Sequence, residues 1–74
     1  MTEEEFHEMK VGDVFRVEFE KGYRHGNISA ILEENGVRLG FTVKITDAED
    51  KSAIGCYLPV RKDMIIDLPA TRMT

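Results

Sequence analysis

An aromatic ring and two basic side chains stand together at Tyr23, Arg24 and His25, one of the two places where basic residues gather in this chain. Aromatic rings stack on exposed bases and nearby cations attract the phosphate backbone, so this group could contact a single-stranded nucleic acid. A surface cluster beside a turn is the alternative interpretation. The sequence therefore predicts only a secondary contact at this position.

Arg61 and Lys62 form the second basic group, followed directly by the acid Asp63. A guanidinium can stack on the face of a base and fork onto a phosphate, so Arg61 suits a nucleic-acid contact. The alternative is a solvated turn in which Asp63 is an ordinary acidic neighbour.

Side chains that could support catalysis or bind a metal do not come together in the sequence. His7, His25 and Cys56 lack the spacing of a zinc site. Cys56 alternates with the apolar residues of an expected strand, so we expect buried packing rather than a nucleophile. The clustered carboxylates fall in polar loops, where water surrounds them. We therefore expect neither an enzyme nor a bound metal or cofactor.

Length and charge narrow the choice of partners. The 74 residues carry 14 acids against 10 Lys and Arg, a net charge of −4, which argues against nonspecific adhesion to nucleic acid but allows a local basic site. So short a chain buries only about 60% of its unfolded surface. Its one cysteine offers no intrachain disulfide, so self-association is the remaining source of stability. With no secretory signal and no apolar run of about 18 residues, we expect a cytoplasmic protein without membrane contact.

A long central hairpin is the element that must position these side chains. Its second strand alternates strictly, which predicts one buried face composed of Val37, Leu39, Phe41, Val43 and Ile45. In the preceding strand Ile28, Ala30 and Leu32 are expected to share a face. Asn35-Gly36 joins the two runs, and this pair favours the tight hairpin turn because both central residues need a positive φ.

Short elements flank this hairpin. Thr2 and Glu5 have the spacing of a capping box, which predicts a helix over about residues 2–10. Gly26 predicts a bend or bulge, and Pro59 places the end of its strand at a sheet edge or a bend. Strands are also predicted over residues 13–20, 23–33, 53–60 and 64–68, with a loose tail at 69–74. The predicted fold is mostly β, with a short N-terminal helix and a five-stranded, strongly bent antiparallel small barrel (residues 13–68) in a single domain, 1–74.

This order of elements resembles that of the Sm and Sm-like proteins over nearly the whole chain. The segment VFRVEFEKGYRHGNISAI is similar to the family's first motif, with Gly22 as its turn glycine and Gly26 as its second glycine. The segment VRKDMIIDL is similar to the second motif. The chain departs from the family pattern at three places. Lys21 replaces an acid, Lys62 replaces a glycine, and Glu33-Glu34-Asn35-Gly36 is only loosely similar to the family's Asp, Met-Asn signature.

The resemblance implies a homo-oligomeric ring in which the fourth strand of one subunit pairs with the fifth strand of the next. It also implies single-stranded RNA bound near the inner rim of the ring. Carried over by position, Asn35 contacts a base edge and Arg61 contacts a base face or a phosphate, with Lys62 and Asp63 in the same turn.

A protein-interaction module is the alternative from a different class. The same small barrel, of the Sm-like or Src-homology kind, would recruit a protein partner through an exposed strand edge near Tyr57 or Ile65. The acidic composition favours this alternative. A ribosome-associated barrel of the KOW type is a third hypothesis, suggested by the segment from Gly22 to Gly26 alone.

Overall fold

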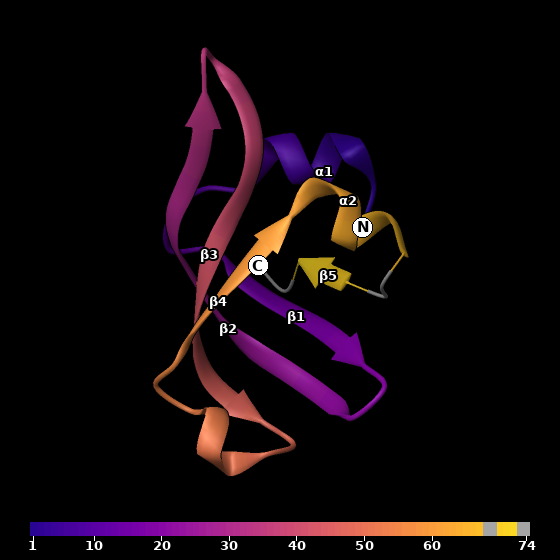
Figure 1. Ribbon diagram of the computed structural model, residues 1–74, viewed down its shortest axis with the longest axis vertical. Coiled ribbons are helices and arrows are strands. Elements are labelled where there is room, and N and C mark those ends of the chain that lie inside the picture. The colour runs from indigo at the N-terminus through magenta and orange to yellow at the C-terminus, as the bar shows by residue number, and fades with distance from the viewer. Residues whose placement is uncertain (68–69, 73–74) are drawn as a thin grey trace.

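The computed structural model describes residues 1–67 and 70–72 and places a short helix beside an antiparallel sheet (Figure 1). The strand order in the sheet is β4-β3-β2-β1-β5. In chain order the elements are α1 (Glu3–Glu8), β1 (Val14–Phe19), β2 (Gly22–Glu34), β3 (Val37–Ala48), the short 3₁₀ helix η1 (Lys51–Ala53), β4 (Tyr57–Arg61), α2 (Lys62–Asp67) and β5 (Ala70–Arg72). The predicted mostly β fold with a short N-terminal helix is confirmed.

Helix α1 begins with the capping box that the sequence predicts. The Thr2 hydroxyl accepts a hydrogen bond from the Glu5 backbone N–H at 3.1 Å, and the Glu5 carboxylate accepts one from the Thr2 N–H at 3.2 Å. These reciprocal bonds satisfy backbone donors that the first turn of a helix leaves unpaired. The helix ends at Glu8, two residues earlier than expected, because Met9 adopts an extended conformation.

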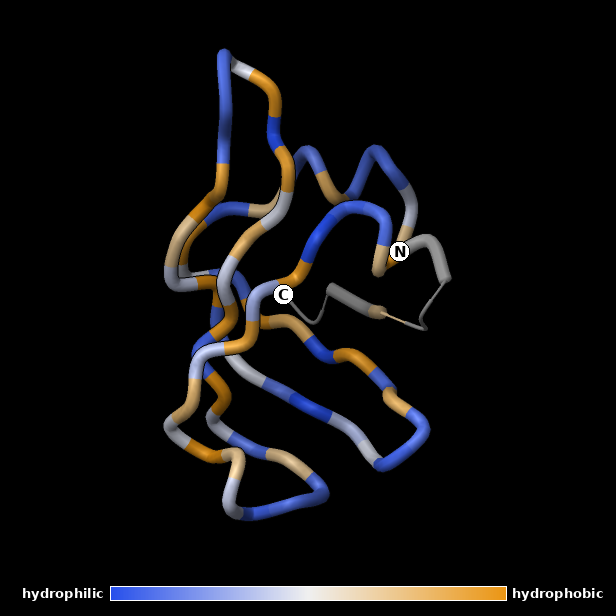
Figure 2. The backbone as a smooth tube through the Cα atoms, in the orientation of Figure 1, coloured by the Kyte–Doolittle hydropathy of each residue, from blue (hydrophilic) through white to orange (hydrophobic). Residues whose placement is uncertain are grey.

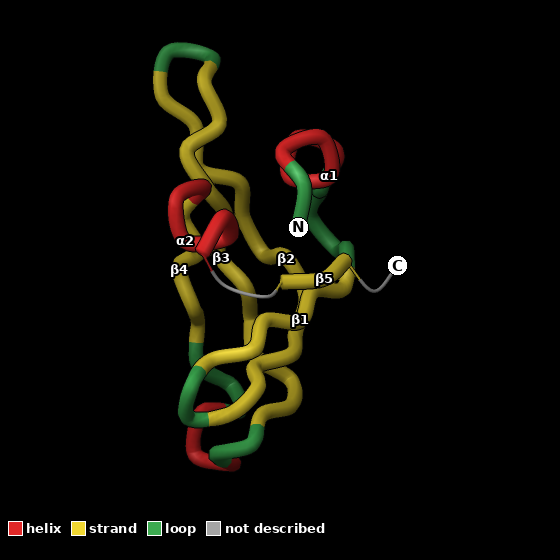
Figure 3. Tube along the Cα trace, turned by 90° about the vertical axis from the view of Figure 1, so that its right-hand side faces the viewer, coloured by secondary structure: helices red, strands yellow, loops and turns green. Residues whose placement is uncertain are grey.

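The β2–β3 hairpin is the longest feature of the fold, and its turn is as predicted. Asn35 and Gly36 have φ values of 52° and 79°. The far part of the hairpin projects beyond the rest of the molecule in two perpendicular views (Figures 1 and 3). We call this projecting part, residues 31–40, the hairpin arm.

Three shifts in the β2–β3 register bend this hairpin, and the residues left without a direct partner are Ser29, Leu39 and Thr46. The shift before Gly26 confirms the predicted bulge. A side chain at Gly26 would collide with the Lys44 carbonyl, so only glycine lets β3 approach this closely. Because of the shift at Ser29, Ile28 is buried whereas Ala30 and Leu32 are exposed, so the prediction that these three share a face is wrong.

The core forms between α1, the sheet and α2. Phe41 is fully buried, and its ring lies 5.2 Å from the Phe15 ring and 5.7 Å from the Phe6 ring between centroids. Of the alternating residues on β3, the three nearest the body of the sheet are buried as predicted: Phe41, Val43 and Ile45. The prediction is wrong for Val37 and Leu39, which are exposed because the arm extends past the core.

The fourth strand is shorter than predicted. Residues 51–53 form η1, and the chain then turns at Gly55 (φ 92°) before β4 begins at Tyr57. Cys56 lies in this connection and is exposed, so the prediction that it is buried packing is wrong. Pro59 lies in β4, an edge strand of the sheet, as predicted.

The prediction of a fifth strand over residues 64–68 is wrong for residues 64–67, which belong to α2. Asp63 suits the first turn of a helix, and the apolar run that follows it lacks strand alternation. Ile65, predicted near an exposed edge, is only 3% exposed and joins the core. Residues 70–72 form β5 against β1 where a loose tail was predicted, while 68–69 and 73–74 lie outside the described residues. Strands β4 and β5 are the two edges of the described sheet, so it is not closed into a barrel.

Candidate functional site

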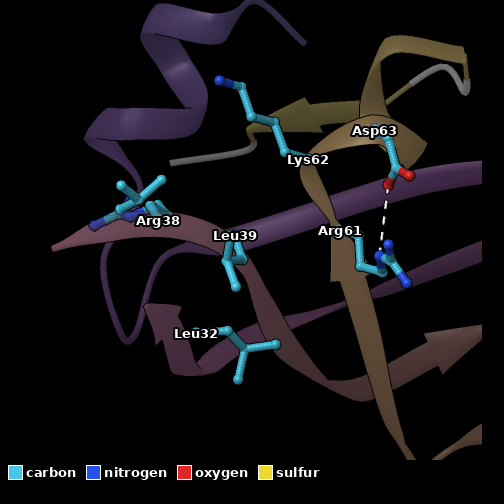
Figure 4. A pocket seen from close by; sticks show the side chains of 7 residues that line it. Leu32, Arg38, Leu39, Arg61, Lys62 and Asp63 are labelled. Atoms are coloured by element: carbon cyan, nitrogen blue, oxygen red, sulfur yellow. Dashed lines mark ion pairs between the residues drawn. The ribbon is translucent and has the colours of Figure 1, made fainter. Parts of the chain in front are cut away.

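A groove lies where the hairpin arm meets the junction of β4 and α2, and Figure 4 shows it from close by. We call it the arm groove. Its volume is about 560 Å³, and its lining residues are Leu32, Val37, Arg38, Leu39, Arg61, Lys62 and Asp63. The structure therefore brings the predicted group of Arg61, Lys62 and Asp63 together with four side chains of the arm.

The arm supplies an apolar surface to this groove. Val37 is 59% exposed, Leu39 46% and Leu32 39%. Figure 4 shows Leu32 and Leu39 next to each other, and Figure 2 shows apolar stretches on both strands of the arm below a hydrophilic tip. Bulges re-aim side chains, and Leu39 is the residue that the register shift leaves without a direct partner.

Gly40 sets the distance between the arm and the basic end of the groove. It pairs with Arg61 across β3 and β4. A Cβ atom at Gly40 would collide with the Val60 carbonyl oxygen and lie 3.0 Å from the Arg61 Cα atom. The absence of a side chain here lets the end of β4 lie close against β3, and it places Arg61 beside Gly40, the residue that follows Leu39 in the arm.

Two of the three cations that line the groove also hold α1 in place. The Arg38 guanidinium donates hydrogen bonds to the carbonyl oxygens of Phe6 and Met9 at 2.9 and 2.6 Å. The Lys62 ammonium donates a hydrogen bond to the Glu3 carboxylate, and this contact lowers the pKa of Glu3 below its ordinary value. Both cations are therefore engaged within the chain.

Arg61 is placed differently from these two cations. Its Nε atom lies 3.7 Å from an Asp63 carboxylate oxygen, a distance longer than a hydrogen bond, and both side chains are largely exposed. In Figure 4 the Arg61 side chain lies to the right of Leu39, and its guanidinium is next to the Asp63 carboxylate. Among the groove cations in the described part of the chain, Arg61 is the one best exposed to an incoming anionic group.

Asn35 does not join this group. It lies at the exposed tip of the arm, adopts the left-handed conformation that the turn requires, and is not among the residues that line the groove. The positive φ that this tight turn requires is enough to explain why an asparagine stands at this position.

The predicted secondary contact, formed by Tyr23, Arg24 and His25, lies outside the arm groove, and its side chains do not lie together. The Tyr23 hydroxyl donates a hydrogen bond to the Asp47 carboxylate at 3.0 Å, and the Arg16 guanidinium covers the ring at 4.2 Å from its centroid. Hydrogen bonds from Lys51 and Tyr23 lower the pKa of Asp47. One face of the ring and its hydroxyl are therefore already in contact with protein groups.

Arg24 and His25 alternate along β2, so their side chains project to opposite faces of the sheet. Arg24 lines a second, smaller pocket of about 400 Å³ with Phe19, Glu20, Lys21 and Leu58. His25 does not line either pocket. The three residues of this cluster thus do not present one common surface.

In the described residues, no three His, Cys, Asp or Glu side chains come close enough together to hold a metal ion. None of the described helices has the length and apolar character needed to cross a membrane. No family model, curated protein or solved structure matches this chain. The resemblance to Sm-like proteins rests on the expected order of elements and on two sequence segments, and we treat it below as a proposal.

Sequence analysis did not predict four of the residues that line the groove: Leu32, Val37, Arg38 and Leu39. The alternation of β3 marks Val37 and Leu39 as apolar, but the same pattern describes core residues and exposed residues of a projecting arm. Arg38 stands between two apolar residues and resembles any solvated strand position. A signal that could have found them is the length of the hairpin, since two strands of 13 and 12 residues exceed what so small a core can cover.

Proposed function

We propose that this protein is a non-catalytic protein-interaction module whose arm groove binds an extended polypeptide segment that carries apolar side chains and a carboxylate. The observation that carries this proposal is the meeting of three exposed aliphatic side chains with the exposed Arg61 in one groove. Burial of apolar surface contributes about 25 cal/mol per Å², so covering the arm would supply binding energy. Arginine is one of the residue types enriched among the side chains that dominate the binding energy of protein interfaces.

The chemistry of Arg61 supports a carboxylate on the partner. The ion pair with Asp63 is made by the Nε atom of Arg61, and the two terminal nitrogens of a guanidinium form a fork that matches a carboxylate. Among the described contacts none occupies these terminal nitrogens. A partner carboxylate can therefore bind there without displacing Asp63.

A second candidate function is the binding of single-stranded RNA by an Sm-like module assembled into a ring. It is favoured by the position of three basic side chains, Arg38, Arg61 and Lys62, on one groove. The free edges of β4 and β5 would permit ring assembly. Against this candidate, the groove is lined by aliphatic rather than aromatic side chains, and nucleic-acid bases bind chiefly by stacking.

Fluorescence anisotropy with labelled probes separates the two candidates. The first probe is a peptide in which leucine and valine alternate with glutamate, and its control replaces each glutamate with lysine. Uridine-rich and adenine-rich RNA are the remaining probes. We expect binding of the acidic peptide, weak binding of the basic peptide and no saturable binding of either RNA.

Substitutions locate the binding surface in the same assay. Leu39→Asp and Arg61→Ala should each weaken binding of the acidic peptide about tenfold, which corresponds to about 1.4 kcal/mol. Ile54→Asp and Lys21→Ala are matched controls, because both side chains are exposed away from the groove and should leave affinity unchanged. Circular dichroism confirms that each variant is folded. Salt-sensitive RNA binding that needs Arg61 but not Leu39 would replace our proposal with the second candidate.

A further inference from the structure

The face of the hairpin arm that borders the groove has an acid at its tip and a base at its foot. Glu34 is the direct partner of Val37 in the β2–β3 register. Directly opposed residues of antiparallel strands project to the same face of a sheet, so Glu34 shares the face of the groove-lining Val37. Along this face the order is therefore a carboxylate at the tip, aliphatic side chains in the middle and the Arg61 guanidinium at the foot.

We infer that the arm groove binds the hairpin arm of a second copy of this chain, in a symmetric dimer. This inference rests on the proposed function, because the arm is itself an extended segment with apolar side chains and a carboxylate. A two-fold axis between two antiparallel arms brings each Glu34 to the partner's Arg61 and covers both aliphatic surfaces at once. The surface is self-complementary, as a two-fold interface requires.

The aliphatic side chains of the arm are left uncovered within one copy, and the described contact of the arm with α1 is made by Arg38. Its two strands project past the core, and its three aliphatic groove residues are each more than one-third exposed. An isolated two-stranded ribbon is only marginally stable in water, and exposed apolar surface of this kind is typical of interaction sites. A second arm covers this surface, and its Glu34 carboxylate binds the terminal nitrogens of Arg61, so each Arg61 of the dimer gains a carboxylate partner.

Charge reversal tests this arrangement by analytical ultracentrifugation over a range of protein concentrations. We expect a monomer–dimer equilibrium for the natural chain. With Glu34→Lys, two cations face each other at each end of the interface. With Arg61→Glu, two anions face each other at each end. Each variant alone should therefore dimerise at least tenfold more weakly.

Complementation provides the sharper measurement. When the E34K and R61E variants are mixed in equal amounts, both contacts of the mixed dimer again join opposite charges, so a dimer should reappear. The double variant E34K/R61E should dimerise by itself for the same reason. Glu33→Lys is the matched control, because it changes the net charge equally but alternates with Glu34 along β2 and pairs with Arg38, whose guanidinium turns toward α1. It should leave dimerisation intact.

A natural chain that remains monomeric at every concentration overturns the inference. So does a dimer or larger ring that both single variants leave unchanged, or a mixture of the two variants that stays monomeric. The proposed function is tested separately by adding the acidic peptide to the E34K variant, which retains Arg61 and the aliphatic residues. If the natural chain never dimerises but the E34K variant binds the peptide, the second copy is removed as the occupant and the proposed function stands. Conversely, dimers that follow the expected charge pattern uphold the inference.

Discussion

The guanidinium of Arg38, on the hairpin arm, donates a hydrogen bond of 2.6 Å to the backbone carbonyl oxygen of Met9 at the end of α1. This bond joins two parts of the chain that lie 29 positions apart. The last carbonyls of a helix have no partner within the helix, and a cation there also complements the negative end of the helix dipole. Arg38 therefore helps to hold α1 against the sheet.

Arg38→Ala should lower the free energy of unfolding by about 2 kcal/mol, because hydrogen bonds from charged donors contribute about 1.5–3 kcal/mol. Urea denaturation followed by circular dichroism measures this change. Lys44→Ala removes an exposed cation from the same strand and is the control, with an expected change of less than about 0.5 kcal/mol. Equal stability of the two variants would show that Arg38 does not anchor α1.

Phe41 and Val37 lie on the same strand but should respond very differently to truncation. Phe41 is 0% exposed between two other phenylalanine rings, so Phe41→Ala should cost about 3–5 kcal/mol of stability. Val37 projects from the arm, and Val37→Ala should cost less than about 0.5 kcal/mol while weakening dimerisation or peptide binding. Thermal unfolding and the binding assays measure the two effects. A large loss of stability from Val37→Ala would mean that the arm belongs to the folding core.

The parts of the fold that were predicted correctly depend on short-range patterns. The capping residues Thr2 and Glu5 act within one helical turn, and Asn35-Gly36 determines the hairpin through its own backbone preferences. The alternation of β3 is similarly local. The alternation does not show where along β3 the core ends. The exposure of Val37 and Leu39 could therefore not be predicted from it.

The errors arise where tertiary contacts decide between similar local preferences. The apolar run from Met64 is short enough for a strand or a helix, and burial of Ile65 against the core accompanies the helix. Within the candidate site, the clustering of Arg61 with its neighbours was visible in the sequence. The aliphatic side of the groove was not, because it depends on the bulge at Leu39 and on how far the arm projects.

Gly26→Ala should be strongly destabilising although it adds only one methyl group. The new Cβ would collide with the Lys44 carbonyl and approach the Val43 side chain, and neither the backbone nor the packed core can move freely. Overpacking of this kind typically costs about 1–3 kcal/mol. Ala30→Thr enlarges an exposed residue of the same strand and should change stability by less than about 0.5 kcal/mol. Urea unfolding of both variants makes the comparison, and a neutral Gly26→Ala would show that the strands are not this close.

The ion pair between Glu3 and Lys62 should make stability depend on pH in the acidic range. Lys62 lowers the pKa of Glu3 from its ordinary value of 4.5, so the folded chain releases this proton more readily than the unfolded chain. The resulting stabilisation is complete above the ordinary value and is lost as the pH falls through the lower pKa of the folded state. Asp47 and Asp50, whose pKa values are also lowered, add to the loss in the same direction.

Glu3→Gln removes only the first of these contributions. The fall in melting temperature between about pH 7 and about pH 3 should therefore be smaller in this variant than in the natural chain, without vanishing. Because both side chains are solvent-exposed in part, added salt should reduce the difference between the two proteins. Glu4→Gln, with no described ion pair to Lys62, is the control and should retain the full pH dependence. If Glu3→Gln and Glu4→Gln behave alike at low and high salt, the contact between α1 and α2 does not contribute to stability.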